Sequence, residues 1–99
     1  MTPEQTIKTQ ICQWLELHRI FFWIQVQNPG KYRSRHIKRG ICDLMGIFRG
    51  KPLAIEVKAP GGRVSPEQEK FIEEFRREGG IAFTAKSVEE VEKQLKEVC

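Results

Sequence analysis

An acid and a base lie two residues apart in the stretch Leu53–Lys58. Its alternating side chains predict a β-strand whose three odd-numbered apolar residues face the core, while Glu56 and Lys58 share the other face. A carboxylate and an ammonium group held side by side on a rigid strand are suited to gripping a metal ion and a phosphate oxygen. Taken alone, such a pair is more often a solvated charge pair, so its function depends on which other side chains join it.

A second carboxylate, that of Asp43, is brought to this strand by a predicted hairpin. Residues 42–48 are predicted as a strand, and residues 49–52 turn it back into the first one. A register centred on the middle of this turn places Asp43 opposite Lys58 and diagonal to Glu56, on one face of the sheet. A slip of one residue would place the Asp43 carboxylate among core side chains, which its desolvation opposes.

Two helices each place one polar side chain in line with apolar ones. The first begins at Thr2 and carries Glu4, and the second begins at Ser65 and carries Gln68. Both starts have the residue pattern of a capping box followed by proline at the first helical position. For Glu4 the helix dipole is the simpler explanation, whereas for Gln68 a capping role and an inward position in a site explain the spacing equally well.

The remaining segments complete an α/β fold of one domain, residues 1–99. Phe21–Val26 predicts a strand because it is rich in aromatic and branched residues. Ile81–Ala85 predicts another, parallel to Leu53–Lys58 because a helix connects them. A last helix begins after Ser87. The expected order is therefore α-β-β-β-α-β-α around a mixed four-stranded sheet, and the composition, 39% hydrophobic and 30% charged, is that of a globular chain.

The positive charge is concentrated in one part of the chain. Residues 1–50 hold eight Lys or Arg against three acids, and residues 51–99 hold nine against ten. This local surplus favours a polyanionic partner over general solubility, although an ordinary solvated loop is the alternative. Interleaved aromatic side chains could also stack on exposed bases. The candidate nucleic-acid contacts are Lys31, Tyr32, Arg33, Arg35, His36, Lys38, Arg39 and Arg63.

Three widely spaced cysteines, Cys12, Cys42 and Cys99, form no CxxC pair. A zinc site or a disulfide framework is therefore not expected, and a reducing compartment is. The polar start of the chain does not fit a signal peptide, and no apolar run approaches the length of a membrane span. We expect a cytoplasmic protein with no membrane partner.

Asp43 and Glu56 at the ends of adjacent strands offer hard oxygen ligands of the kind that Mg²⁺ or Mn²⁺ prefers. Such an ion activates water and neutralises charge on a phosphate, and Lys58 would orient or deprotonate that water. The combination predicts hydrolysis of a phosphodiester. One such polar group would be unremarkable, but four separate elements each supply one.

Three motifs in the middle of the chain extend this pattern. They are Gly40-Ile41-Cys42-Asp43-Leu44, Ile55-Glu56-Val57-Lys58 and Gly62-Arg63-Val64-Ser65-Pro66-Glu67-Gln68. In this order they resemble the VRR-NUC (virus-type replication-repair nuclease) family of the PD-(D/E)xK superfamily, which implies a restriction-endonuclease-like core. Cys42 stands where the family usually has proline. The resemblance further implies that Asp43, Glu56, Glu4 and the backbone carbonyl of Val57 bind the metal, that Lys58 assists the nucleophilic water, and that Gln68 orders the site.

The resemblance implies a stand-alone, Mg²⁺- or Mn²⁺-dependent DNA endonuclease in a bacterial or phage-infected cell, with no small-molecule cofactor. Its expected substrate is branched DNA such as a four-way junction, and its expected form is a homodimer. Two alternatives belong to other functional classes. One is a nucleic-acid-binding module that keeps the fold without catalysis or needs a partner for it, and the other is a small structural domain whose acids only cap helices and solubilise.

Overall fold

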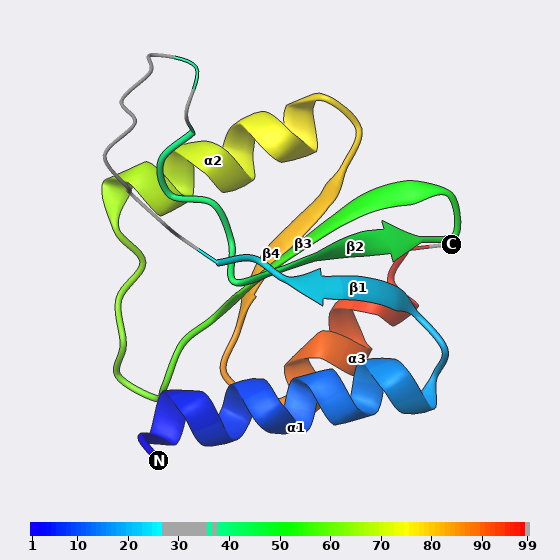
Figure 1. Ribbon diagram of the computed structural model, residues 1–99. Coiled ribbons are helices and arrows are strands. Elements are labelled where there is room, and N and C mark those ends of the chain that lie inside the picture. The colour runs from blue at the N-terminus through cyan, green and yellow to red at the C-terminus, as the bar shows by residue number, and fades with distance from the viewer. Residues whose placement is uncertain (27–35, 37, 99) are drawn as a thin grey trace.

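The computed structural model describes residues 1–26, 36 and 38–98. A single mixed sheet has the strand order β1-β2-β3-β4, in which the first three strands are antiparallel and β3 and β4 are parallel. This arrangement confirms the predicted α/β fold and its order of elements (Figure 1). The elements are α1 (Pro3–Leu17), β1 (Phe21–Ile24), β2 (Leu44–Phe48), β3 (Lys51–Val57), α2 (Pro66–Arg77), β4 (Ile81–Ala85) and α3 (Val88–Lys96).

Both predicted capping boxes are present. The Thr2 hydroxyl accepts a hydrogen bond from the Gln5 backbone N–H, and the Gln5 side chain accepts one from the Thr2 N–H. Ser65 and Gln68 make the same reciprocal pair at the start of α2. Because these bonds satisfy amide groups that have no partner inside a helix, they define where each helix begins.

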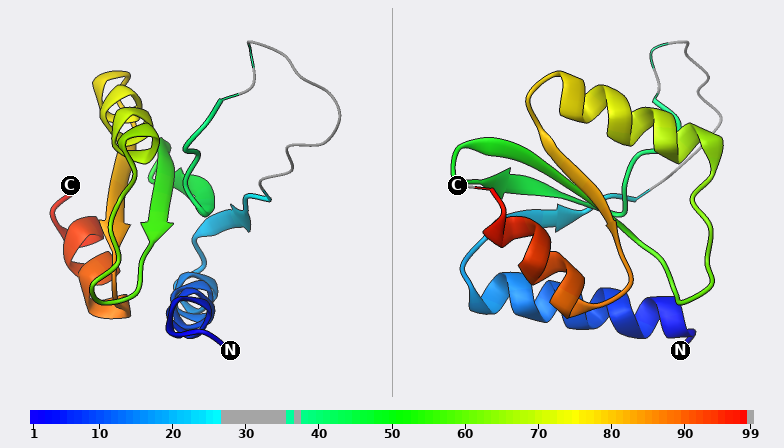
Figure 2. Two further views of the ribbon diagram at one scale, coloured as in Figure 1. Left: turned by 90° about the vertical axis from the view of Figure 1, so that its left-hand side faces the viewer. Right: turned by 180° about the vertical axis from the view of Figure 1, so that it is seen from behind.

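The sheet is covered on both faces, as Figures 1 and 2 show. On one face, α1 and α3 pack against a cluster that includes Leu53, Ile55 and Val57, the three residues predicted to face the core. On the other face, α2 packs against a smaller cluster that includes Ala54. Because α2 covers this face, Glu56 is only 2% exposed, so the pair that it forms with Lys58 is not a solvated one.

The predicted hairpin register was wrong by two residues. The turn consists of Arg49 and Gly50 alone, and both have positive φ angles, 51° and 80°. Such a pair fits the two-residue type I′ turn, and it pairs Phe48 with Lys51. The predicted turn was centred one residue too late because Pro52 was assigned to it.

Pro52 instead lies in β3, opposite Ile47. Its missing N–H breaks no bond to β2, because the pair is the second one from a tight turn and such a pair is non-hydrogen-bonded. It breaks no bond to β4 either, because β4 pairs with β3 only from Leu53 onward. A two-residue shift leaves each side chain on its predicted face. Continuing the observed register places Asp43 opposite Glu56, and not opposite Lys58 as predicted.

The sequence predicts no membrane-spanning segment. None of the helices in the described part of the chain combines the length and the apolar character that crossing a bilayer requires.

Candidate active site

Three carboxyl groups from three elements meet at one end of the sheet. Glu4 comes from the first turn of α1, Asp43 from the residue before β2, and Glu56 from β3. Each offers an oxygen atom, and these oxygens lie within 4.8 Å of one another. Oxygen ligands around a small divalent cation are separated by about 3–4 Å, so the cluster has a suitable size for one.

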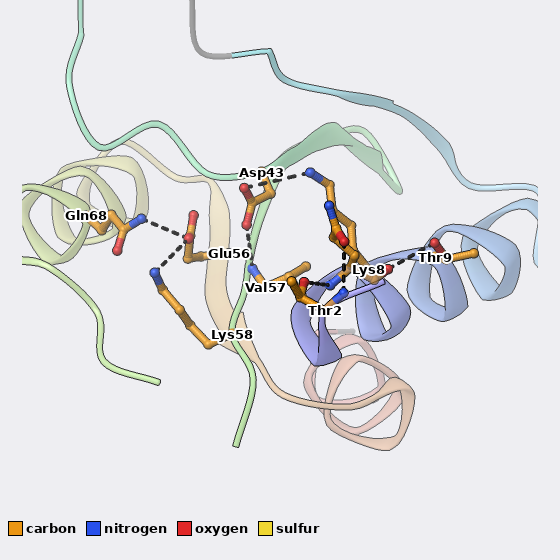
Figure 3. A network of polar contacts seen from close by, with 9 residues as sticks. Thr2, Lys8, Thr9, Asp43, Glu56, Val57, Lys58 and Gln68 are labelled. Carbon is orange, nitrogen blue, oxygen red and sulfur yellow. Dashed lines mark hydrogen bonds and ion pairs between the residues drawn. The ribbon is translucent and has the colours of Figure 1, made fainter. Parts of the chain in front are cut away.

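The Glu56 carboxylate is held by neighbours on one side only (Figure 3). Its Oε2 atom accepts a hydrogen bond of 2.8 Å from the Gln68 side-chain amide and lies 3.4 Å from the Lys58 ammonium nitrogen. Its Oε1 atom is buried and accepts no hydrogen bond from the described residues. One lone-pair side of a buried carboxylate is therefore unsatisfied, which costs free energy unless another group, such as a cation, occupies it.

The pKa of Glu56 is raised from its ordinary value of 4.5 to about 7. Burial is the main cause, because it disfavours the charged form, and the negative charge of the nearby Asp43 carboxyl group adds to it by repulsion. The Lys58 ammonium group opposes the shift and does not cancel it.

Asp43 ends the regular pairing of β2 with β3. Its Oδ2 atom accepts a hydrogen bond of 3.0 Å from the Val57 backbone N–H, in place of a backbone carbonyl, and Figure 3 shows the two groups facing each other. The ligand role of the Val57 carbonyl stays a prediction.

Gln68 performs both of the functions that the sequence left open. Its side-chain oxygen accepts the hydrogen bond from the Ser65 N–H that closes the capping box, and its side-chain nitrogen donates to Glu56. The capping bond fixes the orientation of the amide, so the nitrogen is already aimed at the carboxylate. The start of α2 is thereby tied to the acid cluster.

These residues fit a divalent cation. The donors are hard carboxylate oxygens, one carboxylate has a buried oxygen without a partner, and burial, with the neighbouring negative charge of Asp43, raises the pKa of Glu56. An ion bound there would satisfy the free oxygen and remove the repulsion between Asp43 and Glu56.

Residues 2–89 match the family defined by the VRR-NUC domain. The chain belongs to the VRR-NUC family. A solved structure described as a "VRR_NUC domain protein" has a TM-score of 0.69 and 26% sequence identity, and the match covers 94% of this chain and 84% of that one. No curated protein matches the chain. Membership in the VRR-NUC family gives the chain a nuclease-type fold, and its acid cluster suggests divalent-metal binding.

The residue before the aspartate of this VRR-NUC chain is a packing residue. Cys42 is fully buried and joins the cluster beneath α2. Burial first, and then the negative charges of Glu56 and Asp43, raise the pKa of its thiol to about 12. The thiol is therefore neutral and unreactive near neutral pH, so Cys42 fills space here without taking part in the chemistry.

The predicted nucleic-acid contacts are only partly within the described chain. Lys31, Tyr32, Arg33 and Arg35 lie outside the described residues. His36, Lys38, Arg39 and Arg63 are exposed.

Gly40 ends the basic segment, which is the Lys- and Arg-rich stretch of residues 31–40, and leads the chain into the acid cluster. It adopts a φ of +73°, and a Cβ atom at this position would overlap the backbone carbonyl of Glu67 and crowd the backbone nitrogen of Gln68. The chain at residues 38–42 therefore packs directly on the first turn of α2 (Figure 1). This places the exposed side chains of Lys38 and Arg39 on the segment that leads to the Gln68 end of the site.

One charged side chain at the cluster, that of Lys8, is not among the predicted site residues. The Lys8 ammonium nitrogen lies 4.0 Å from Asp43 Oδ1. A signal for it exists in the sequence, because Lys8 follows Glu4 by four residues and so lies on the same face of the helix. Which strand end that face meets depends on how α1 crosses the sheet, which the sequence pattern does not specify.

Proposed function

We propose that this VRR-NUC chain is a Mg²⁺- or Mn²⁺-dependent endonuclease that hydrolyses phosphodiester bonds in branched DNA. The observation that carries the proposal is the meeting of three carboxyl groups, one of which, that of Glu56, has a buried and unsatisfied oxygen, beside the Lys58 ammonium group. A structural role for these acids leaves that oxygen without an explanation, because natural folds rarely bury a carboxylate atom that has no partner.

Asp43, Glu56, Glu4 and the Val57 carbonyl are the proposed metal ligands. When bound, the ion would lower the pKa of a coordinated water and neutralise charge on the phosphate that is attacked. Glu56 must be ionised to serve as a ligand, so binding the cation displaces its proton. Gln68 holds the carboxylate in place through the 2.8 Å hydrogen bond to Oε2.

Lys58 is proposed to orient the attacking water and, through the positive charge of its ammonium group, to favour the loss of a proton from that water to the solvent. Its ammonium nitrogen lies 3.4 Å from Glu56 Oε2, and its side chain is 17% exposed, so it is positioned by the ligand itself while its tip reaches the site. A group that must contact both a ligand and a water molecule needs this combination of a fixed position and partial access.

The DNA is proposed to lie across the start of α2. Lys38, Arg39 and Arg63 are exposed on the two segments that flank this helix start, and His36 is exposed nearby. Together with the remaining basic residues of the segment they would contact backbone phosphates, which makes binding strongly dependent on salt. We further propose that two copies of the chain form a homodimer, which would suit paired cuts in a four-way junction.

The test is cleavage of an end-labelled four-way junction beside matched linear, flap and splayed DNA, with Mg²⁺, Mn²⁺ or chelator. We expect metal-dependent product from the parent protein and a loss of at least about 100-fold in Asp43→Asn and Lys58→Ala, because removing a charge-stabilising or proton-transfer group typically costs that much. Lys96→Ala is the matched control, since Lys96 is exposed and makes an ion pair with Glu92 at the end of α3, next to the hairpin turn at Arg49 and away from the acid cluster.

Equal cleavage by the parent and Asp43→Asn would refute the proposed site. Cleavage confined to flaps or single strands would keep the chemistry and change the substrate. Salt-sensitive binding without product in either metal would instead identify a binding module that retains the nuclease fold.

A further inference from the structure

Two lysines approach the acid cluster from different elements. Lys58 follows β3 and contacts Glu56, whereas Lys8 projects from α1 and contacts Asp43, and Figure 3 shows their ammonium groups on opposite sides of the two carboxylates. The proposed roles of the site residues account for Lys58 and leave Lys8 without one.

The contact between Lys8 and Asp43 is a loose one. The distance of 4.0 Å lies at the limit of an ion pair, and the two side chains are 30% and 29% exposed. Asp43 already accepts a 3.0 Å hydrogen bond from Val57 through its other oxygen. A half-exposed pair of this kind stabilises a fold by less than about 1 kcal/mol, so stability is a weak reason for its presence.

The charge of the cluster changes sign when a cation binds. Three carboxylates and two lysines leave the free site at a formal charge of −1 when all are ionised, and a divalent ion makes it +1. Lys8 then faces a cation that competes with it for the Asp43 carboxylate, and its attraction to Asp43 weakens. At the same moment the site becomes attractive to a phosphate group.

We propose that Lys8 is a phosphate-binding residue, which leaves Asp43 when the divalent cation binds and donates a hydrogen bond to the scissile phosphate of the DNA. The proposal rests on the proposed nuclease function. Because Lys8 lies one ion-pair distance from a proposed metal ligand, a phosphate that reaches the cation also comes within reach of this ammonium group. The two lysines thus have separate roles: Lys58 orients the water and Lys8 binds the phosphate.

The test compares Lys8→Gln and Lys8→Arg with the control Lys96→Gln, which also removes one lysine and one exposed ion pair, but on α3, outside the proposed DNA-binding surface. At saturating Mg²⁺ we expect kcat/KM for the junction to fall about 10- to 100-fold in Lys8→Gln and to recover in part in Lys8→Arg, since one charge-assisted phosphate contact accounts for that range. Thermal melts of both variants with chelator check that the fold is retained.

Two further readouts separate this role from a structural one. Lys8→Gln should bind Mg²⁺ at least as tightly as the parent protein in calorimetry, because a competing cation has been removed from Asp43. In a Lys58→Ala background, which prevents cleavage, Lys8→Gln should weaken DNA binding in Mg²⁺ and leave it unchanged in chelator. A residue that merely holds Asp43 in place would give weaker metal binding and no such dependence on metal.

Cleavage by Lys8→Gln within twofold of Lys96→Gln would overturn the inference while leaving the nuclease function intact. So would equal effects of Lys8→Gln on DNA binding with and without Mg²⁺. Failure of the parent protein to cleave in any metal would reject both proposals together. This outcome differs from failure of the Lys8 role alone, because the parent and Asp43→Asn would then behave alike.

Discussion

Glu56 is 2% exposed and lies beside Asp43, so ionising both carboxyl groups in the free protein places two negative charges together where water cannot screen them well. The Lys58 ammonium group relieves this only in part, because the pKa of Glu56 still rises to about 7. The free protein thus carries a strained electrostatic arrangement at its proposed site, and a trade-off between stability and activity of this kind is common in enzymes.

The stability of the metal-free protein should therefore depend on pH. A carboxyl group with a pKa of about 7 in the folded state and an ordinary value of 4.5 when unfolded binds more protons in the folded state. Its stabilising contribution is complete below pH 4.5 and is lost as the pH rises through 7. We expect the free energy of unfolding in urea with chelator to fall by on the order of 2–3 kcal/mol from this group between pH 5 and 8.

Glu56→Gln is the control for this pH dependence. It removes the titrating group and keeps a side chain that can accept the hydrogen bond from Gln68, so the variant should lose most of the fall in stability. It should also be more stable than the parent protein at pH 8, and inactive. Parallel stability curves for the two proteins would show that Glu56 is not the group responsible.

Added Mg²⁺ should reverse the effect of pH. The ion binds only ionised carboxylates, and a ligand that binds the folded state alone stabilises it. We therefore expect roughly 5–10 mM Mg²⁺ to increase the Tm more at pH 8 than at pH 6. Asp43→Asn should abolish the increase at both values, and an increase that persists in this variant would place the ion elsewhere.

At the scale of the elements, local signals predicted the helix starts correctly and the hairpin incorrectly. Thr2 and Ser65 cap their helices as the sequence indicates, because a capping box is made by residues three apart. The hairpin depends on Arg49 adopting a φ of 51°, which its residue type does not favour, while Pro52 gave a stronger but misleading turn signal. The predicted faces were still correct, because the error was an even number of residues.

Gly40 is the element-scale link between the basic segment and Gln68. An added methyl group would meet the backbone of Glu67 at a position whose φ of +73° already disfavours other residues. We expect Gly40→Ala to lower the free energy of unfolding by about 2 kcal/mol or more and to reduce cleavage, because the first turn of α2 must move.

Gly61→Ala is the control for Gly40→Ala, since Gly61 has a similar φ of +86° and open space around it. It should show only the cost of the backbone conformation, about 1 kcal/mol. Equal destabilisation in the two variants would mean that the contact with α2 contributes nothing, and cleavage should then be unaffected as well.

At the scale of the whole molecule, the proximity of the two strand acids could be predicted from the residues, whereas the placement of α1, which brings Glu4 and Lys8 to them, could not. Asp43 and Glu56 lie on neighbouring strands of one hairpin, so their proximity follows from the sheet even with an imperfect register. Lys8 reaches Asp43 only because α1 lies across the sheet at one particular place, and that placement results from packing among Ile11, Leu15 and the strands. Interactions between elements distant in sequence therefore account for what the motifs missed.

The proposed homodimer has its best candidate interface on β1. This strand is at the edge of the sheet, and Phe21 and Trp23 lie on it 65% and 45% exposed, with their rings in an edge-to-face contact. Phe22, by contrast, packs against the core and is a poor candidate. Exposed aromatic side chains on an edge strand are costly in a monomer, because they invite non-specific association, and a specific partner would remove that cost.

Phe21→Ser combined with Trp23→Ser should therefore convert a dimer into a monomer, measured by light scattering during size-exclusion chromatography. Leu17→Ser is the control, since Leu17 is 78% exposed but belongs to α1. The monomer should keep its acid cluster and nick junctions singly, whereas the parent protein should cut both strands in one encounter. A parent protein that is monomeric at micromolar concentration would exclude the dimer while leaving the chemistry of the site untouched, because the three proposed carboxylate ligands and Lys58 all come from one chain.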